Sequence, residues 1–173
     1  MEHGVRYEIG DDGVATLTLD RPDKRNAVMP PDWRALEDRL DDGSADPNVR
    51  VFVLTGQGSM FCSGGDLKSM GERLAQSPVR RSREMLRMTR AIQRFRETPK
   101  PIIGAVNGPA IGAGCVIALA CDVRLATASA GLHHVCEPRG WRLRHFEDEH
   151  IGVGFGLHIF MPAAARSART CRA

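Results

Sequence analysis

The stretch that decides the fold is KPIIGAVNGPAIGAGCVIALACDVRLAT, from Lys100 to Thr127. Its first part, Pro101 to Val106, is short and apolar, which favours a buried strand. Asn107-Gly108-Pro109 follows as a turn, and small residues from about Gly112 to Ala120 predict a helix. Asp122 to Ala126 is typical of the next strand. This order of strand, glycine-containing loop, helix and strand indicates an α/β architecture.

The residues before this stretch continue the same pattern. Val5 to Ile9 and Val14 to Leu19 flank the turn tripeptide Asp11-Asp12-Gly13, which predicts a hairpin. Pro30-Pro31 can begin a helix, and apolar residues recur after it at helical spacing. We expect this helix to end by Asp42-Gly43.

A second glycine-rich loop follows another apolar strand. Val49 to Thr55 (VRVFVLT) predicts a strand that is covered on both faces, and GQGSMFCSGGD comes directly after it. We expect a helix after Asp66, interrupted by Ser77-Pro78, and then a second helix. We interpret one apolar stripe of this second helix as core packing, and it consists of Met85, Met88, Ile92 and Phe95.

Length and composition are those of a soluble globular domain. The 173 residues are 42% hydrophobic and 26% charged, with a net charge of +3. No basic run contains interleaved aromatic residues, so no nucleic acid partner is expected. No apolar run approaches the roughly 18 residues of a membrane helix, and the N-terminus lacks the layout of a signal peptide. We therefore expect a cytoplasmic protein with no membrane partner.

The cysteines and histidines indicate neither a disulfide framework nor a metal site. Three of the five cysteines lie in apolar or glycine-rich segments, which favours reduced, buried thiols. Five of the six histidines follow residue 130, and their spacing matches no standard zinc pattern. The possible ligands that we considered and set aside are His133, His134, Cys136, His145 and His150.

The two glycine-rich loops are the place where chemistry is expected. Each follows a strand and precedes a helix, where backbone amides are unpaired and the helix N-terminus adds a partial positive charge. If the amides of Gly65 and Ala113 converge, they form an oxyanion hole for the enolate oxygen of a thioester. Alternatively, the glycines only make tight turns. A nucleotide site is a further alternative, although GxxxxGK[ST] is absent and the residues after Gly112 do not complete G-x-G-x-x-G.

Three motifs resemble those of the enoyl-CoA hydratase/isomerase (crotonase) superfamily. They are LDRPDKRNAV (Leu19 to Val28), FCSGGDL (Phe61 to Leu67) and the stretch from Lys100 to Thr127, and the resemblance covers roughly residues 5 to 129. It implies a spiral of ββα units, assembled as a homotrimer or hexamer. It also implies acyl-CoA substrates and no metal or separate cofactor, because coenzyme A is part of the substrate.

The resemblance also implies roles for individual residues. Gly65 and Ala113 take the oxyanion positions, and Lys24 and Arg25 lie where the family often contacts CoA phosphates. A solvated turn is the alternative for these two cations. Asp66 is expected to cap the helix that follows it. The substrate-binding residues so implied are Lys24, Arg25, Ala27, Ser63, Gly64, Asp66, Leu67 and Gly112.

The sequence departs from the family's hydratases at the two catalytic glutamate positions. Val116 occupies the first, and the second falls near Cys136, where no motif supports moving the alignment to Glu137. Enoyl hydration needs groups that can activate water and protonate carbon, and Val116 can do neither. The resemblance therefore implies a relative from fatty acid β-oxidation without the ordinary acid/base pair. The alternative is an inactive acyl-CoA-binding remnant.

The resemblance ends near Ser129. We therefore expect a truncated crotonase-like core over residues 1–129 and an atypical tail over residues 130–173, which is poorly ordered or translated out of frame. Such a chain would expose apolar edges and fold weakly. The DNA sequence decides between reading frames, because a neighbouring frame should continue the family pattern.

Overall fold

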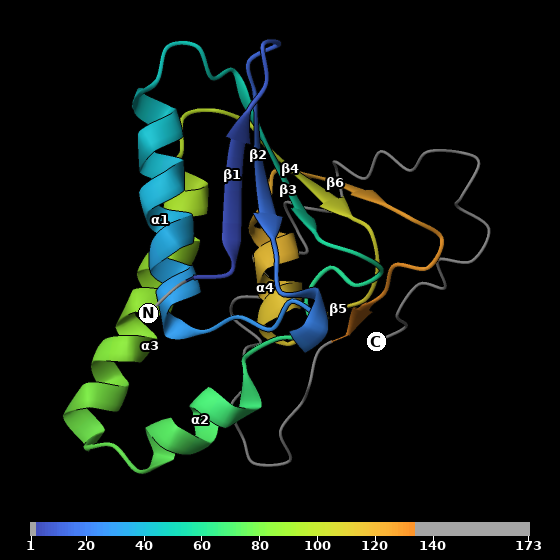
Figure 1. The fold of residues 1–173 in the computed structure, drawn as a ribbon. Coiled ribbons are helices and arrows are strands. Elements are labelled where there is room, and N and C mark those ends of the chain that lie inside the picture. Colours follow the sequence, from blue (N-terminus) through green and yellow to red (C-terminus); the bar gives the residue numbers. More distant parts are fainter. Residues whose placement is uncertain (1–2, 134–173) are drawn as a thin grey trace.

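The computed structural model describes residues 3–133, which form two sheets and the helices that connect and cover them (Figure 1). The larger sheet has the strand order β1-β2-β3-β4-β6, and the smaller pairs β5 with β7. The strands are β1 (Val5–Ile9), β2 (Val14–Leu19), β3 (Val51–Gly56), β4 (Ile102–Val106), β5 (Ala110–Ile111), β6 (Val123–Ala126) and β7 (Leu132–His133). The helices are η1 (Pro22–Lys24), α1 (Pro30–Ala45), α2 (Leu67–Leu74), α3 (Pro78–Glu97) and α4 (Ala113–Ala120).

The direction of the strands places the glycine-rich loops at one edge of the large sheet. β1 and β2 form the expected antiparallel hairpin, in which Val5 pairs with Leu19. β2, β3, β4 and β6 are parallel to one another. The connections that leave the carboxyl ends of β2, β3 and β4 therefore gather at one end of the sheet, the lower end in Figure 1. This edge is where ligands bind in open parallel sheets.

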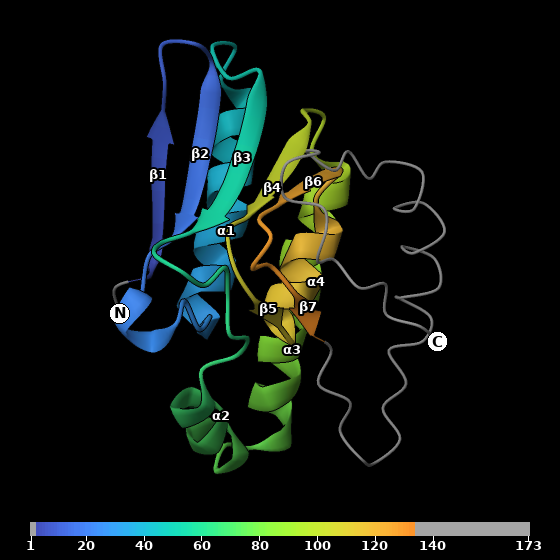
Figure 2. The same ribbon diagram turned by 90° about the vertical axis from the view of Figure 1, so that its right-hand side faces the viewer.

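The hydrophobic core lies between the large sheet and the helices. Figure 2 shows α1 behind β2 and β3, and the same view shows α3 and α4 beside β4 and β6. Side chains from all of these layers are fully buried. Among the largest are Leu17, Leu36, Phe52, Leu54, Phe95, Ile102 and Ile117. The predicted α/β architecture is confirmed over the described residues.

The predicted end of α1 was wrong by a few residues. The helix continues through Gly43 to Ala45. A methyl group on Gly43 would lie 2.6 Å from the Phe52 ring and 2.6 Å from the Tyr7 hydroxyl. Gly43 is therefore needed for close packing against the sheet and does not terminate the helix.

The prediction for the apolar stripe of α3 was wrong at Met85. Ile92 and Phe95 are buried and Met88 is half-buried, but Met85 is 46% exposed. The first half of α3 projects beyond the sheet together with α2 (Figure 1), so its apolar residues have no core to enter. Core packing therefore begins only near Met88.

Other predictions have a mixed outcome. The cysteines Cys62, Cys115 and Cys121 are buried, as expected. Residues 134–173 lie outside the described residues, and with them His134, Cys136, His145, His150 and most of the proposed tail. The division into a core over residues 1–129 and a tail stays a prediction. Within residues 3–133, no helix combines the length and the apolar character needed to cross a bilayer.

Candidate functional site

Backbone pairing joins the three connections at the carboxyl edge of the sheet. The segment after β3 pairs through Gly65 with Val28, which follows β2, and through Cys62 with Ala110, which follows β4. The Ile111 N–H donates to the Cys62 carbonyl at 2.9 Å. The two glycine-rich loops thus lie side by side, as neighbouring extended segments.

The amide of Gly65 points away from Val28. The Val28 N–H donates to the Gly64 carbonyl at 2.8 Å, and the Val28 carbonyl accepts from the Asp66 N–H at 3.0 Å. Because a trans peptide sets its C=O and N–H in opposite directions, the Gly65 N–H faces the other side of the segment. That is the side on which the same loop meets β5. No acceptor for this N–H is found among residues 3–133.

The amide of Ala113 lies close to the same loop. Ala113 is the first residue of α4, where a helix has no internal acceptor for its N–H groups. A methyl group placed on Gly64 would be 3.6 Å from the Ala113 nitrogen. Within the described chain, the Ala113 N–H also has no acceptor. The structure therefore brings the two predicted donors into one neighbourhood.

Gly114 fixes the approach of α4 to the loop. A methyl group here would lie 2.5 Å from the Cys62 carbonyl oxygen and 2.6 Å from Cys62 Cβ. Glycine is thus required for α4 to rest directly on the loop. Cys62 is buried, and this burial raises the pKa of its thiol to about 11, so it is a packing residue and a poor nucleophile.

Two asparagine side chains hold the loop after β3, and sequence reasoning missed both roles. Asn26 is buried, and its Nδ2 donates to the Gln57 and Met60 carbonyls at 2.9 and 2.7 Å. Asn107 Nδ2 donates to the Gly56 and Gly58 carbonyls, both at 2.7 Å. Both residues stand in the quoted motifs, but only the folded chain shows that they bond to one loop from two sides.

A hollow of about 820 Å³ opens beside the Gly65 loop. Cations outnumber carboxylates in its wall, and the rest consists of apolar residues, two serines and a glycine. It is lined by Arg21, Lys24, Arg25, Ala27, Met29, Ser63, Gly65, Asp66, Leu67, Lys68, Ser69, Glu72 and Ile111. An anionic ligand with an apolar part would find both kinds of contact here.

Asp66 is occupied by local contacts. Its Oδ1 accepts the Ser69 N–H at 2.9 Å, which is the helix cap predicted from the sequence. This hydrogen bond, together with the nearby Arg21 guanidinium, lowers the pKa of the Asp66 carboxyl. Arg21 in turn donates to the Ala27 carbonyl at 2.9 Å. Asp66 and Arg21 thus connect α2 to the segment after η1.

Most of the residues predicted to bind substrate, and the predicted oxyanion residue Gly65, line this hollow, although their roles stay predictions. Those that line it are Lys24, Arg25, Ala27, Ser63, Gly65, Asp66 and Leu67. Gly64 is buried and does not line the hollow, and neither do Gly112 and Ala113, which follow the lining residue Ile111 in the chain. Sequence reasoning missed six lining residues. Lys68, Ser69 and Glu72 lie in α2, and the other three are Arg21, Met29 and Ile111. Val116 is half-buried and packs against the core.

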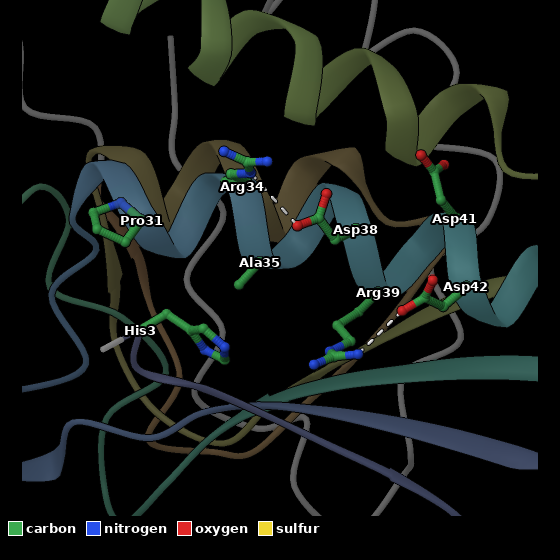
Figure 3. Close-up of a pocket in the computed structure, with 8 residues that line it drawn as sticks. All are labelled: His3, Pro31, Arg34, Ala35, Asp38, Arg39, Asp41 and Asp42. Atoms are coloured by element: carbon green, nitrogen blue, oxygen red, sulfur yellow. Dashed lines mark hydrogen bonds and ion pairs between the residues drawn. The ribbon is translucent and has the colours of Figure 1, made fainter. Parts of the chain in front are cut away.

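A second hollow, of about 630 Å³, lies between α1 and the start of β1 (Figure 3). Charged side chains dominate its wall, and two of its ion pairs are internal to α1, with Arg39 3.0 Å from Asp42 and Arg34 3.7 Å from Asp38. It contains none of the residues predicted from the motifs. Among residues 3–133, no cluster of histidine, cysteine and carboxylate side chains could hold a metal ion.

Comparisons with known proteins agree with the motifs. The family model described as enoyl-CoA hydratase/isomerase matches residues 10–135. A Mycobacterium leprae protein named as a probable enoyl-CoA hydratase is 42% identical over 122 residues, which are 69% of this chain and 46% of that protein.

Solved structures give the same result. The chain superposes on an enoyl-CoA hydratase/isomerase from Xanthobacter autotrophicus with a TM-score of 0.71 and 34% identity, covering 78% of this chain and 49% of that one. An enoyl-CoA hydratase from Polaromonas gives 0.69 and 33%, with 73% and 49% covered. The chain spans about half the length of the relatives that it matches. It belongs to the enoyl-CoA hydratase/isomerase family, with the crotonase fold.

Proposed function

We propose that this chain binds an acyl-CoA thioester and stabilises an enolate oxygen with the amides of Gly65 and Ala113. The observation that carries the proposal is the pairing of Val28 with both neighbours of Gly65. It directs the Gly65 N–H away from Val28, and the Ala113 nitrogen lies near the adjacent Gly64; neither amide has an acceptor among the described residues. Two preorganised donors of this kind suit a thioester carbonyl that gains negative charge.

The wall of the hollow supports the choice of a CoA ester. Coenzyme A carries several phosphate charges, and Arg21, Lys24, Arg25 and Lys68 supply cations in the wall of the hollow. Met29, Leu67 and Ile111 supply apolar contacts near the glycine loops. The proposed substrate therefore places its phosphates near the cations and its acyl group against the apolar residues.

The proposed reaction class is the hydration or isomerisation of a fatty acyl-CoA. Val116 supplies no proton-transfer group at the start of α4, so the amides alone would polarise the thioester from this side. Family membership now argues against the nucleotide-binding alternative. Calorimetry with crotonyl-CoA, compared with ATP and NAD, tests the ligand class, and the loss of the enoyl absorbance of crotonyl-CoA tests turnover.

The decisive experiment removes one donor. Ala113→Pro deletes the N–H at the first position of α4, where proline is tolerated, and Ala113→Ser is the control that keeps the N–H. Acetoacetyl-CoA is the probe, because its enolate has its own ultraviolet absorbance. We expect Ala113→Pro to reduce enolate formation on the order of a hundredfold and Ala113→Ser to change it little. Equal enolate signals from both variants would refute the assignment of Ala113.

A further inference from the structure

The positive charge of the described chain is concentrated on α3. The 20 residues of this helix contain seven arginines and two glutamates, a net charge of +5, whereas the whole chain carries +3. Arg80, Arg83, Arg87 and Arg90 recur at intervals of three or four residues. Residues at this spacing share one side of a helix, so the four guanidinium groups form a row, called the arginine row below.

The arginine row faces solvent. All four of its members are exposed, whereas the buried residues Ala91, Ile92 and Phe95 lie toward the C-terminal end of α3. Within residues 3–133 none of the four forms an ion pair, in contrast to Arg94, which pairs with Asp41 of α1 and with Glu97. Four like charges at adjacent helical positions repel one another, so an anionic partner would stabilise them.

Apolar side chains lie directly beside the arginine row. Val79 is 63% exposed and Leu86 is 54% exposed, and each is three or four residues from a member of the row. They belong to the half of α3 that projects beyond the sheet with α2 (Figure 1). No aromatic residue is among the exposed large hydrophobic residues of the described chain. Base stacking on a nucleic acid would need such residues.

We propose that the projecting half of α3 docks on a membrane surface that carries anionic phospholipids. Arginines gain attraction from the negative headgroups, and Val79 and Leu86 can enter the interface between headgroups and acyl chains. Residues 75–77 connect α3 to α2, whose residues line the candidate site. Docking would therefore bring the site, if the proposed function holds, to the surface where amphiphilic acyl thioesters collect.

The test is co-sedimentation of the 173-residue chain with lipid vesicles. Vesicles containing about 30% phosphatidylserine are compared with pure phosphatidylcholine at low and high salt. The test variant is Arg80→Gln/Arg83→Gln/Arg87→Gln. The matched control, Arg6→Gln/Arg34→Gln/Arg50→Gln, removes the same charge from exposed arginines outside α3. A second pair compares Leu86→Ser with Ile9→Ser, because Ile9 is a 44% exposed apolar residue on β1.

The expected result is binding to the anionic vesicles only, weakened by salt. Loss of three arginines should weaken it roughly a hundredfold, and the matched control severalfold at most. Leu86→Ser should weaken binding more than Ile9→Ser does. Absence of vesicle binding at low salt, equal loss in the two triple variants, or binding of single-stranded RNA without vesicle binding would each overturn the proposal. These outcomes are independent of the acetoacetyl-CoA experiment.

Discussion

The loop from Ser59 to Asp66 and the first half of α3 differ in how the fold holds them. The loop pairs with Val28 on one side and Ala110 on the other, and two asparagine side chains donate to the carbonyls of Gly58 and Met60. In the first half of α3 most side chains are exposed, including the apolar Val79 and Leu86.

The two regions meet different requirements for rigidity. Donors for a developing charge must be fixed in advance, and a loop whose backbone is bonded on both sides satisfies that requirement. A helix that docks on a fluid lipid surface does not need a fixed position. Its side chains can therefore be packed loosely against the rest of the protein. Substitutions in the two regions should therefore differ in their cost to folding, which gives four ways to test the comparison.

The largest effect is expected within α3 itself, between its buried and exposed halves. Phe95→Ala removes a side chain that is 1% exposed, which should lower the free energy of unfolding by about 3 to 5 kcal/mol. Met85→Ala removes a 46% exposed side chain and should change it by less than about 0.5 kcal/mol. Urea denaturation of both variants measures the difference. Similar losses would show that the first half of α3 is packed after all.

Asn26→Ala should give the next largest effect. The change leaves the Gln57 and Met60 carbonyls and the Arg21 N–H without their buried partner. It also places alanine at a φ of 55°, so we expect a loss of about 3 kcal/mol. Asn26→Gly removes the steric cost of the positive φ at this position, so it should be about 1 kcal/mol more stable than Asn26→Ala. Equal urea midpoints for the two variants would mean that this backbone conformation carries no cost.

The contact between α4 and the loop can be tested with a pair of glycines. Gly114→Ala forces a methyl group against Cys62, and we expect a loss of about 1 to 3 kcal/mol together with weaker acyl-CoA binding. Gly71→Ala is the control, because a methyl group on Gly71 in α2 meets nothing within 4 Å. It should stabilise the chain by about 0.5 to 1 kcal/mol. Thermal melts and calorimetry with crotonyl-CoA distinguish the two outcomes.

The sequence predicted those features of the fold and the site that depend on residues close together in the chain. The hairpin, both loop-to-helix transitions and the cap at Asp66 follow from turn residues and apolar spacing, and the structure confirms them. Gly43 and Met85 were misinterpreted, because packing against Phe52 and the length of the sheet are tertiary properties. The bonds donated by Asn26 Nδ2 span more than 30 residues, and no local pattern indicates them.

The smallest effect is expected at Asp66, the last residue of the loop, which caps α2. Asp66→Ala removes the cap of α2 and should cost about 1 kcal/mol at pH 7, whereas Asp66→Asn keeps a capping oxygen and should cost less. The folded-state pKa of Asp66 is lowered below its ordinary value of 3.8, so its charge stabilises the fold above that pH. This contribution should fade as the pH falls through 3.8 and below. Urea melts of wild type and Asp66→Asn should therefore differ at pH 7 and converge in acid. A gap that persists in acid would mean that the Asp66 charge is not what stabilises the start of α2.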